Sequence, residues 1–140
     1  MHSLVRALMS VPGFDALDEH GLLEVVGCSA NMIWPTGSAV FRSGEPAEAL
    51  YVVLSGSVRI VEGTDGEATE VARIGPGDYF GELSLLLDET HVRSAVVDEE
   101  AELLVVPKEP FQELLESQPD LAAEFRKKAE ERVPTSFDRS

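Results

Sequence analysis

Short β-prone runs separated by glycine-bearing turns fill residues 31–107 of this 140-residue chain, and they constrain its fold more than any other feature. Many short runs with glycine and proline between them are typical of a β-sandwich or a β-barrel. Residues 64–67, Thr-Asp-Gly-Glu, lie between two runs and predict a hairpin turn. The predicted strands are residues 32–34, 39–41, 50–54, 58–61, 71–74, 94–97 and 103–106.

Helical patterns precede this β region. Apolar residues recur at helical spacing over residues 4–9, and the pattern ends at a Pro-Gly pair. A second helix is predicted over residues 15–26, with Asp15 or Asp18 as its N-cap.

Helical patterns also follow the β region. One helix is predicted through Phe111 and stops before Pro119, and the next begins at Pro119 and ends at Val133, before another proline. The whole chain is therefore expected to be a single domain, mainly β with flanking helices. Its expected parts are N-terminal helices (1–28), a β-roll (29–107), C-terminal helices (108–133) and a tail (134–140).

The segment from residue 79 to residue 97, YFGELSLLLDETHVRSAVV, carries the chemistry. Its layout predicts a strand that ends at Gly81, a short helix, a loop and another strand. A helix that begins after Gly81 would direct free backbone N–H groups at an anion, and Arg93 could bind the same anion through its guanidinium. Glu82 could accept hydrogen bonds from sugar hydroxyls. An anion site beside a sugar site suggests a cyclic nucleotide as ligand.

This segment resembles the phosphate-binding cassette of the cyclic nucleotide-binding domain family, whose pattern is roughly F-G-E-(L/I)-(A/S/G)-(L/I), a variable loop and R-(S/T/A)-A. The glycine-bearing stretches at residues 35–37, 41–45 and 50–58 also look like signatures of that family. The resemblance implies an antiparallel β-roll, a double-stranded jelly-roll barrel, with a short cassette helix. The residues that match the cassette are Phe80, Gly81, Glu82, Leu83, Ser84, Leu85, Arg93, Ser94 and Ala95.

The resemblance also implies a role for each polar position. Glu82 is expected to bind the ribose 2′-hydroxyl, and Arg93 the cyclic phosphate. The backbone N–H groups near Leu83 and Ser84, with the Ser94 hydroxyl, complete the expected anion site. In the alternative interpretation the pocket has decayed, and Glu82 and Arg93 remain as a structural ion pair.

The charge of the chain excludes several classes of partner. With 11 basic against 26 acidic residues, the net charge is −15. Nucleic-acid surfaces and anionic membranes attract clustered Lys and Arg, so neither is an expected partner. No apolar run has the length of a membrane span and no signal peptide is recognised, which predicts a cytoplasmic protein.

Other reactive side chains have ordinary interpretations. His2, His20 and His91 have no metal-ligand spacing and are expected to be solvated or locally hydrogen-bonded, so no metal is predicted. Cys28, the single cysteine, forms no internal disulfide and is expected to be a small core residue. The acidic run at residues 98–100 is interpreted as a solvated turn between strands.

Two further features concern packing. Trp34 is expected to be half-buried in the core. Leu121, Phe125, Ala129 and Val133 recur every fourth residue on the last predicted helix, which favours packing onto the barrel or a lid over a strong dimer seam.

These observations predict a sensor or regulatory module for a cyclic nucleotide, cAMP rather than cGMP, with no enzymatic activity and no cofactor. Ligand is expected to move the C-terminal helices, whose surface an unidentified protein effector would then recognise. The protein is expected to be a monomer or a weak dimer. The alternatives are a ligand-free interaction module on the same fold and, less favoured because no catalytic constellation is present, a jelly-roll enzyme.

Overall fold

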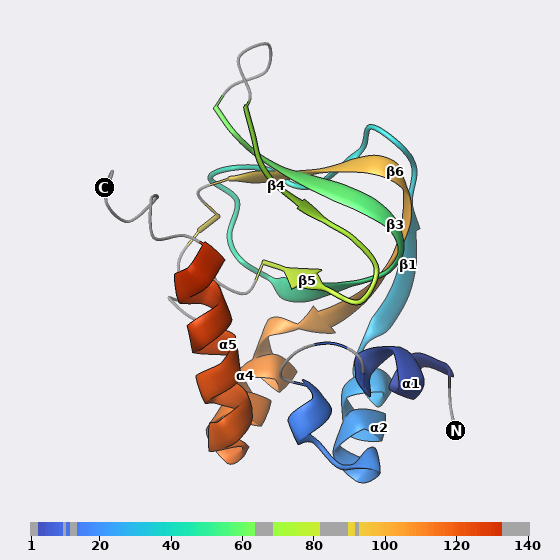
Figure 1. Ribbon diagram of the computed structural model, residues 1–140, viewed down its shortest axis with the longest axis vertical. Coiled ribbons are helices and arrows are strands. Elements are labelled where there is room, and N and C mark those ends of the chain that lie inside the picture. The colour runs from blue at the N-terminus through green and yellow to red at the C-terminus, as the bar shows by residue number, and fades with distance from the viewer. Residues whose placement is uncertain are drawn as a thin grey trace.

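Two long antiparallel strands, paired with each other, lie in the middle of the sheet that forms the barrel (Figure 1). The computed structural model describes residues 3–9, 11, 14–63, 69–81, 90–91 and 93–132. The described elements are α1 (Ser3–Met9), the 3-10 turn η1 (Phe14–Ala16), α2 (Glu19–Gly27), β1 (Ala30–Trp34), β2 (Ala39–Phe41), β3 (Ala49–Glu62), β4 (Thr69–Ile74), β5 (Tyr79–Phe80), β6 (Ser94–Pro107), α4 (Lys108–Ser117) and α5 (Pro119–Arg132). The predicted class, mainly antiparallel β with flanking helices, is confirmed.

The strand order is β1-β6-β3-β4, with β2 paired to β6 and β5 paired to β3, and every pairing is antiparallel. Strands β3 and β6 have 14 residues each and curve around the barrel together (Figure 1). The sequence predicted each of them as two separate short strands. That prediction was wrong because register shifts between Val53 and Val58 bend the pair without ending it.

Gly56 lies at this bend with φ +80°. A Cβ atom there would overlap the backbone of Glu100 and Ala101 on the neighbouring strand. A glycine inside a strand therefore marks a close approach of two backbones here, where the sequence suggested a turn.

The acidic run at residues 98–100 lies inside β6, so its interpretation as a turn between strands is corrected. Asp98 is only partly exposed and accepts a hydrogen bond from Arg73 Nη1 at 3.0 Å. Arg59 Nε lies 3.8 Å from its other carboxylate oxygen. Two arginines on neighbouring strands thus hold this acid on the outer face of the barrel.

Alternation along the strands produces two cores. On β3, Leu50 and Val52 face the helices, whereas Tyr51 and Val53 face the barrel interior. The two-residue β5 divides in the same way, since Tyr79 belongs to the helical core and Phe80 to the interior. The helical core also contains Val5, Leu8, Val11, Phe14, Leu17, Leu22, Val25, Ala47, Leu104, Val106, Phe111, Leu121 and Phe125.

The N-terminal helices meet the barrel at one end. Of the two predicted N-caps, Asp18 is the one used for α2, because its Oδ1 accepts from Gly21 N at 2.8 Å. Cys28 follows α2 and is exposed, so its placement in the core was wrong. Its thiol donates to the Val25 carbonyl at 3.3 Å, which keeps it at the surface end of the helix.

The C-terminal helices begin and end close to the predicted positions, and Pro119 is the first residue of α5. Leu121 and Phe125 are fully buried against the protein's own core, so the predicted packing of this stripe is confirmed for them. The side chain of Ala129 and the whole of Val133 lie outside the described residues. The same holds for the predicted hairpin turn at residues 64–67, although β3 and β4 pair up to Glu62 and Thr69 on either side of it.

Candidate functional site

Gly81 directly follows β5 and has a conformation that favours glycine, with φ +88°. A Cβ atom there would lie 3.2 Å from both the Ala49 carbonyl oxygen and Tyr51 Cδ2. Gly81 therefore fits the predicted turn out of the strand. Glu82, Leu83 and Ser84, with the rest of the predicted cassette helix, lie outside the described residues.

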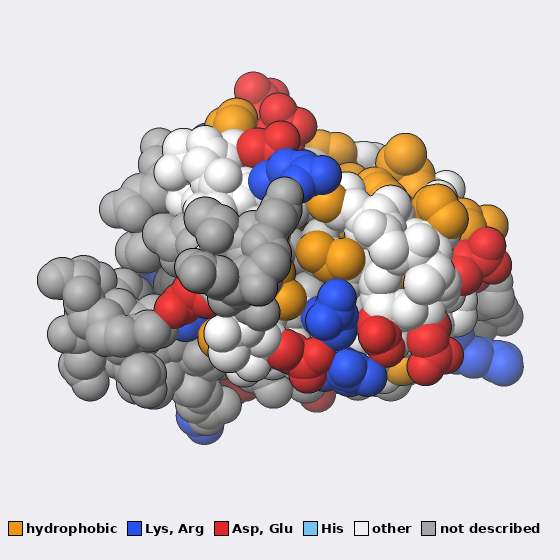
Figure 2. All heavy atoms as spheres, turned by 90° about the horizontal axis from the view of Figure 1, so that it is seen from above, with side chains coloured by type: hydrophobic (Ala, Val, Ile, Leu, Met, Phe, Trp, Pro, Cys, Tyr) orange, Lys and Arg blue, Asp and Glu red, His pale blue; other side chains and the backbone are white. Residues whose placement is uncertain are grey.

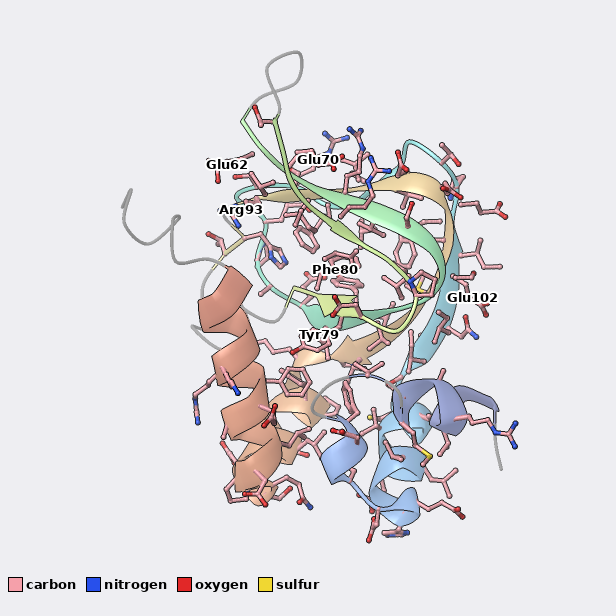
Figure 3. The ribbon with its side chains drawn as sticks, in the orientation of Figure 1. Glu62, Glu70, Tyr79, Phe80, Arg93 and Glu102 are labelled. Atoms are coloured by element: carbon pink, nitrogen blue, oxygen red, sulfur yellow. The ribbon has the colours of Figure 1, made fainter. Side chains whose placement is uncertain are left out.

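Arg93 stands just before β6 and binds a carboxylate. Its Nε donates to Glu62 Oε2 at 2.9 Å, and the two side chains are 14% and 32% exposed. Both lie at the end of the barrel near which α5 ends (Figure 3). This bond uses Nε, and the two terminal Nη groups make no hydrogen bond within the described part of the chain. A guanidinium held in this way has a fixed orientation and retains donors for an anion.

Ser94 links this strand to a neighbouring turn. Its Oγ accepts a hydrogen bond from Ser43 N at 3.0 Å. A hydroxyl that accepts one bond can still donate its own hydrogen. The Ser94 hydroxyl can therefore accept the bond from Ser43 in the turn and, at the same time, donate a hydrogen bond to a ligand.

Phe41 joins the two ends of the predicted cassette. Its ring lies 5.9 Å from that of Phe80, the last residue of β5, and it pairs in register with Ala95, the second residue of β6. Phe80 and Ala95 are buried in the barrel interior and offer no polar group. They can shape the wall of a site, and the polar contacts must come from their neighbours.

An aromatic cluster lines this part of the interior. Tyr51 stacks on Phe80 at 5.2 Å, and Trp34 meets Tyr51 edge-on at 6.3 Å, so Trp34 is half-buried as predicted. Burial, followed by the charges of Glu48 and Glu45, raises the pKa of the Tyr51 phenol. Tyr51 is therefore a neutral part of the wall at physiological pH.

His91 belongs to the same wall and is buried, which corrects the expectation of a solvated side chain. Its ring is 4% exposed and stacks on Phe41 at 3.6 Å, with only 6° between the planes. Burial lowers its pKa to about 4, against an opposing effect of Glu45. Its backbone N–H donates to the Glu45 carbonyl at 2.9 Å, and its carbonyl accepts from Gly44 N at 2.7 Å. His91 thus fastens the turn after β2 to the segment that leads into Arg93.

The other two histidines differ from it. His20 is exposed on α2 and lies 3.2 Å from Glu24, and His2 lies outside the described residues. Across the described ranges, no three His, Cys, Asp or Glu side chains come together as metal ligands. In those ranges, too, none of the helices has the length and apolar character needed to cross a membrane.

Glu62 and His91 are the site residues that sequence reasoning missed. The pairing of β3 with β6 sets Val61 opposite Ser94, so the next positions along, Glu62 and Arg93, become neighbours. This register would have identified Glu62 as the partner of Arg93. The sequence-based prediction divided β3 into two short strands and therefore gave no register. For His91, its position after the polar residues 88–90, Asp-Glu-Thr, and before Arg93 gave no indication of burial.

The model of the cyclic nucleotide-binding domain family matches residues 32–118, from within β1 to the residue that follows α4. This chain belongs to that family. The matched span includes the barrel, the cassette and Arg93, so the resemblance seen in the sequence is confirmed.

Relatives place the same domain in different proteins. The chain is 32% identical over 127 residues to a cyclic nucleotide-gated potassium channel of Mesorhizobium japonicum, covering 91% of this chain and 34% of the channel. It is 37% identical over 91 residues to the cyclic AMP receptor protein of Thermus thermophilus, covering 64% of this chain and 42% of the receptor. The chain thus spans between a third and about two fifths of these relatives.

Among solved structures, the sensor domain of the transcriptional regulator DNR from Pseudomonas aeruginosa superposes with a TM-score of 0.82 at 26% identity. The superposition covers 96% of this chain and 91% of that domain. The likeness extends over the helices as well as the barrel, which confirms the predicted β-roll with flanking helices.

Proposed function

We propose that this domain binds a cyclic nucleotide, with cAMP preferred over cGMP, and acts as a sensor that moves its C-terminal helices. The observation that carries the proposal is Arg93, a mostly buried guanidinium held by Glu62 through Nε alone among the described residues. A buried cation costs free energy unless it has charged partners, and a cyclic phosphate would supply a second one. The family to which the chain belongs favours that anion.

The proposed contacts follow from the positions of the matching residues. Arg93 binds the phosphate through its Nη groups, and the Ser94 hydroxyl donates to the same group. The backbone N–H groups from Gly81 through Leu83 and Ser84 complete the anion site. Glu82 accepts from the ribose 2′-hydroxyl.

A continuous path of packed side chains supports the proposed output. Tyr79 lies two residues before the Gly81 turn, and its ring is 4.7 Å from that of Phe125 on α5. Phe125 in turn meets Phe111 of α4 edge-on at 5.1 Å. A shift of the cassette strand would therefore require both C-terminal helices to repack. A ligand can drive such a shift if it binds one arrangement more tightly than the other.

The preference for cAMP rests on Ser94 and on the similarity to a cyclic AMP receptor protein. The domain itself is proposed to have no catalytic role. A protein effector that recognises α5 would convert the movement into a response.

The test is calorimetric titration of the domain with cAMP, cGMP and 5′-AMP, repeated on Arg93→Leu. Removing one partner of a buried, hydrogen-bonded charge pair costs about 2–5 kcal/mol, or roughly 30- to several-thousand-fold in affinity. Arg73→Leu is the matched control, because Arg73 is half exposed on the outer face and pairs with Glu70 and Asp98. It should bind cAMP like the parent. If Arg93→Leu does too, the assignment of the site fails.

One alternative has an observation in its favour. Glu62 already neutralises Arg93 without any ligand, as expected for a domain that retains only the fold and binds proteins. A parent protein that binds neither cAMP nor cGMP at millimolar concentration would establish this alternative and exclude the sensor.

A further inference from the structure

Strand β1 is an unprotected edge of the sheet. It is the first strand in the order β1-β6-β3-β4, and in the described residues its backbone pairs with β6 alone. Antiparallel strands direct alternate N–H and C=O groups to both sides, so the outer side of β1 offers a row of hydrogen-bonding groups. Figure 1 shows β1 at the right-hand rim of the barrel.

The other described strands limit such pairing in ways that β1 does not. Strand β2 has three residues and β5 has two, which is too short for extended pairing. Strand β4 carries the charged Glu70 and Arg73. Strand β1 runs for five residues, Ala-Asn-Met-Ile-Trp, with no charge, no proline and no register shift. Natural edges are usually blunted by one of those features, so their absence from β1 indicates an edge that is kept available.

The side chains of β1 add apolar surface to this edge. Ile33 is 67% exposed and Met32 is 47% exposed, although both lie in a regular strand. On the side of the molecule where β1 runs, the view from above shows hydrophobic side chains bordered by acidic ones (Figure 2). Exposed apolar groups beside unpaired backbone groups are the features used when a peptide adds to a sheet edge.

The acidic residues around β1 favour a basic partner strand. Residues 19–41 and β6 contain no Lys or Arg. Glu102 lies directly opposite Ile33 across the β1–β6 pair, and Glu99 and Glu100 are exposed farther along β6. The Glu100 amide donates to Thr36 Oγ1 at 3.0 Å, which brings this acidic stretch beside the turn that follows β1. A second copy of the chain would place acid against acid, whereas a basic strand would find complementary charge.

We infer that β1 is a docking edge for an extended, basic segment of a partner protein, which adds to the sheet as a further antiparallel strand. Successive residues of a strand point to opposite faces, so its apolar residues would cover Met32 on one face, and its Lys or Arg side chains would lie on the other face, beside Ile33 and the acidic Glu102 and Glu100. This surface is separate from the proposed nucleotide site, so its test does not depend on ligand binding.

The test uses the full chain and a fluorescein-labelled peptide of alternating lysine and valine, about seven residues long to match a strand. Fluorescence anisotropy should show saturable binding that weakens as salt rises from about 0.05 to 0.3 M. A peptide with glutamate in place of lysine should not bind. Amide NMR shifts on peptide addition should concentrate in β1.

Variants locate the contact. Ile33→Lys places a like charge at the edge and should weaken peptide binding at least about tenfold. Val71→Lys is the matched control, since Val71 is also an exposed apolar residue, 41% accessible, on a different strand. It should bind within about twofold of the parent. Circular dichroism establishes that both variants are folded.

If Ile33→Lys does not fold, a peptide N-methylated at alternate residues replaces it in the test. That peptide can no longer pair as a strand, so it should not bind the parent protein. The inference is overturned by no binding at about 1 mM peptide, which corresponds to a very weak interaction. Equal binding of the glutamate or N-methylated peptide, or equal loss in Val71→Lys, also overturns it. A dimer of the parent that Ile33→Lys dissociates in sedimentation would assign the edge to a second copy instead.

Discussion

At the scale of residues, the ion pair between Arg93 and Glu62 has two opposing effects on ligand binding. Glu62 orients the guanidinium through Nε, but its negative charge repels the phosphate that Arg93 is proposed to bind. A variant of Glu62 that keeps a hydrogen-bond acceptor but has no charge allows the orienting effect and the repulsion to be measured separately.

We therefore expect Glu62→Gln to bind cAMP more tightly, by about 1 kcal/mol or roughly fivefold, as suits the loss of a nearby like charge in a partly hydrated site. Calorimetry at low and high salt measures the change, which should shrink as salt screens the charge. Glu70→Gln, on the outer face beside Arg73, is the control and should leave affinity unchanged. Weaker binding by Glu62→Gln would mean that the charge itself is needed to position Arg93.

His91 makes a prediction about pH and stability. Its pKa is about 4 in the folded protein and 6.5 in the unfolded chain. Above pH 6.5 the ring is neutral in both states. As pH falls towards 4, only the unfolded chain gains the proton, so the free energy of unfolding decreases by about 3 kcal/mol in total.

Thermal melts of the parent and of His91→Phe at several pH values between 7 and 4 measure this effect. Phenylalanine keeps an aromatic ring against Phe41 and cannot be protonated. The parent should therefore lose stability more steeply than His91→Phe below pH 6.5, while the carboxyl groups titrate alike in both. His20→Gln should follow the parent, because His20 is exposed. Parallel curves for the parent and His91→Phe would show that the ring is not held neutral by burial.

At the scale of elements, β5 connects the cassette to the C-terminal helices although it has only two residues. Phe80 faces the barrel interior, and Tyr79 faces Phe125 of α5. Leu121 and Phe125 are fully buried in one cluster with Tyr79, and Leu114 packs against that cluster. The strand therefore contacts both cores, and it is the element through which the movement of α4 and α5 that we propose would be transmitted.

Hydrogen exchange with and without cAMP should consequently change in two places, the cassette and α5. Tyr79→Leu removes the aromatic contact with Phe125 and should weaken the response of α5 while leaving protection around Gly81 and Arg93. Met9→Ala, on the exposed face of α1, is a control that should leave both responses intact. Protection confined to the cassette in the parent would describe a binding site without a switch.

At the scale of the whole molecule, two cores share one set of strands. The inner core fills the barrel, and the outer core fixes all the described helices against its lower end (Figure 1). In this chain of net charge −15, Arg59, Arg73 and Arg93 form ion pairs with Asp98, with Glu70 and Asp98, and with Glu62, respectively. The sites that we propose lie in different regions of the molecule: the cyclic nucleotide at the cassette end, the protein effector on α5 and the basic partner strand at the β1 edge.

The sequence by itself determined the class of fold, most of the helices and strands, an aspartate N-cap for α2 at either Asp15 or Asp18, and the resemblance to the family. Each of these depends on local patterns within the chain, such as periodicity, glycine at turns and a short motif. The same local reading split β3 and β6, because the residues around Gly56 have turn chemistry and only a close neighbouring strand explains that glycine.

Tertiary structure alone decided the partner of Arg93 and the burial of His91. Glu62 lies 31 residues before Arg93 and reaches it through the register of β3 against β6. His91 becomes buried because Phe41, from another strand, stacks on its ring. Both outcomes depend on which face of one strand meets which face of another. A slip of one residue would reverse every side chain, and no local pattern specifies that choice.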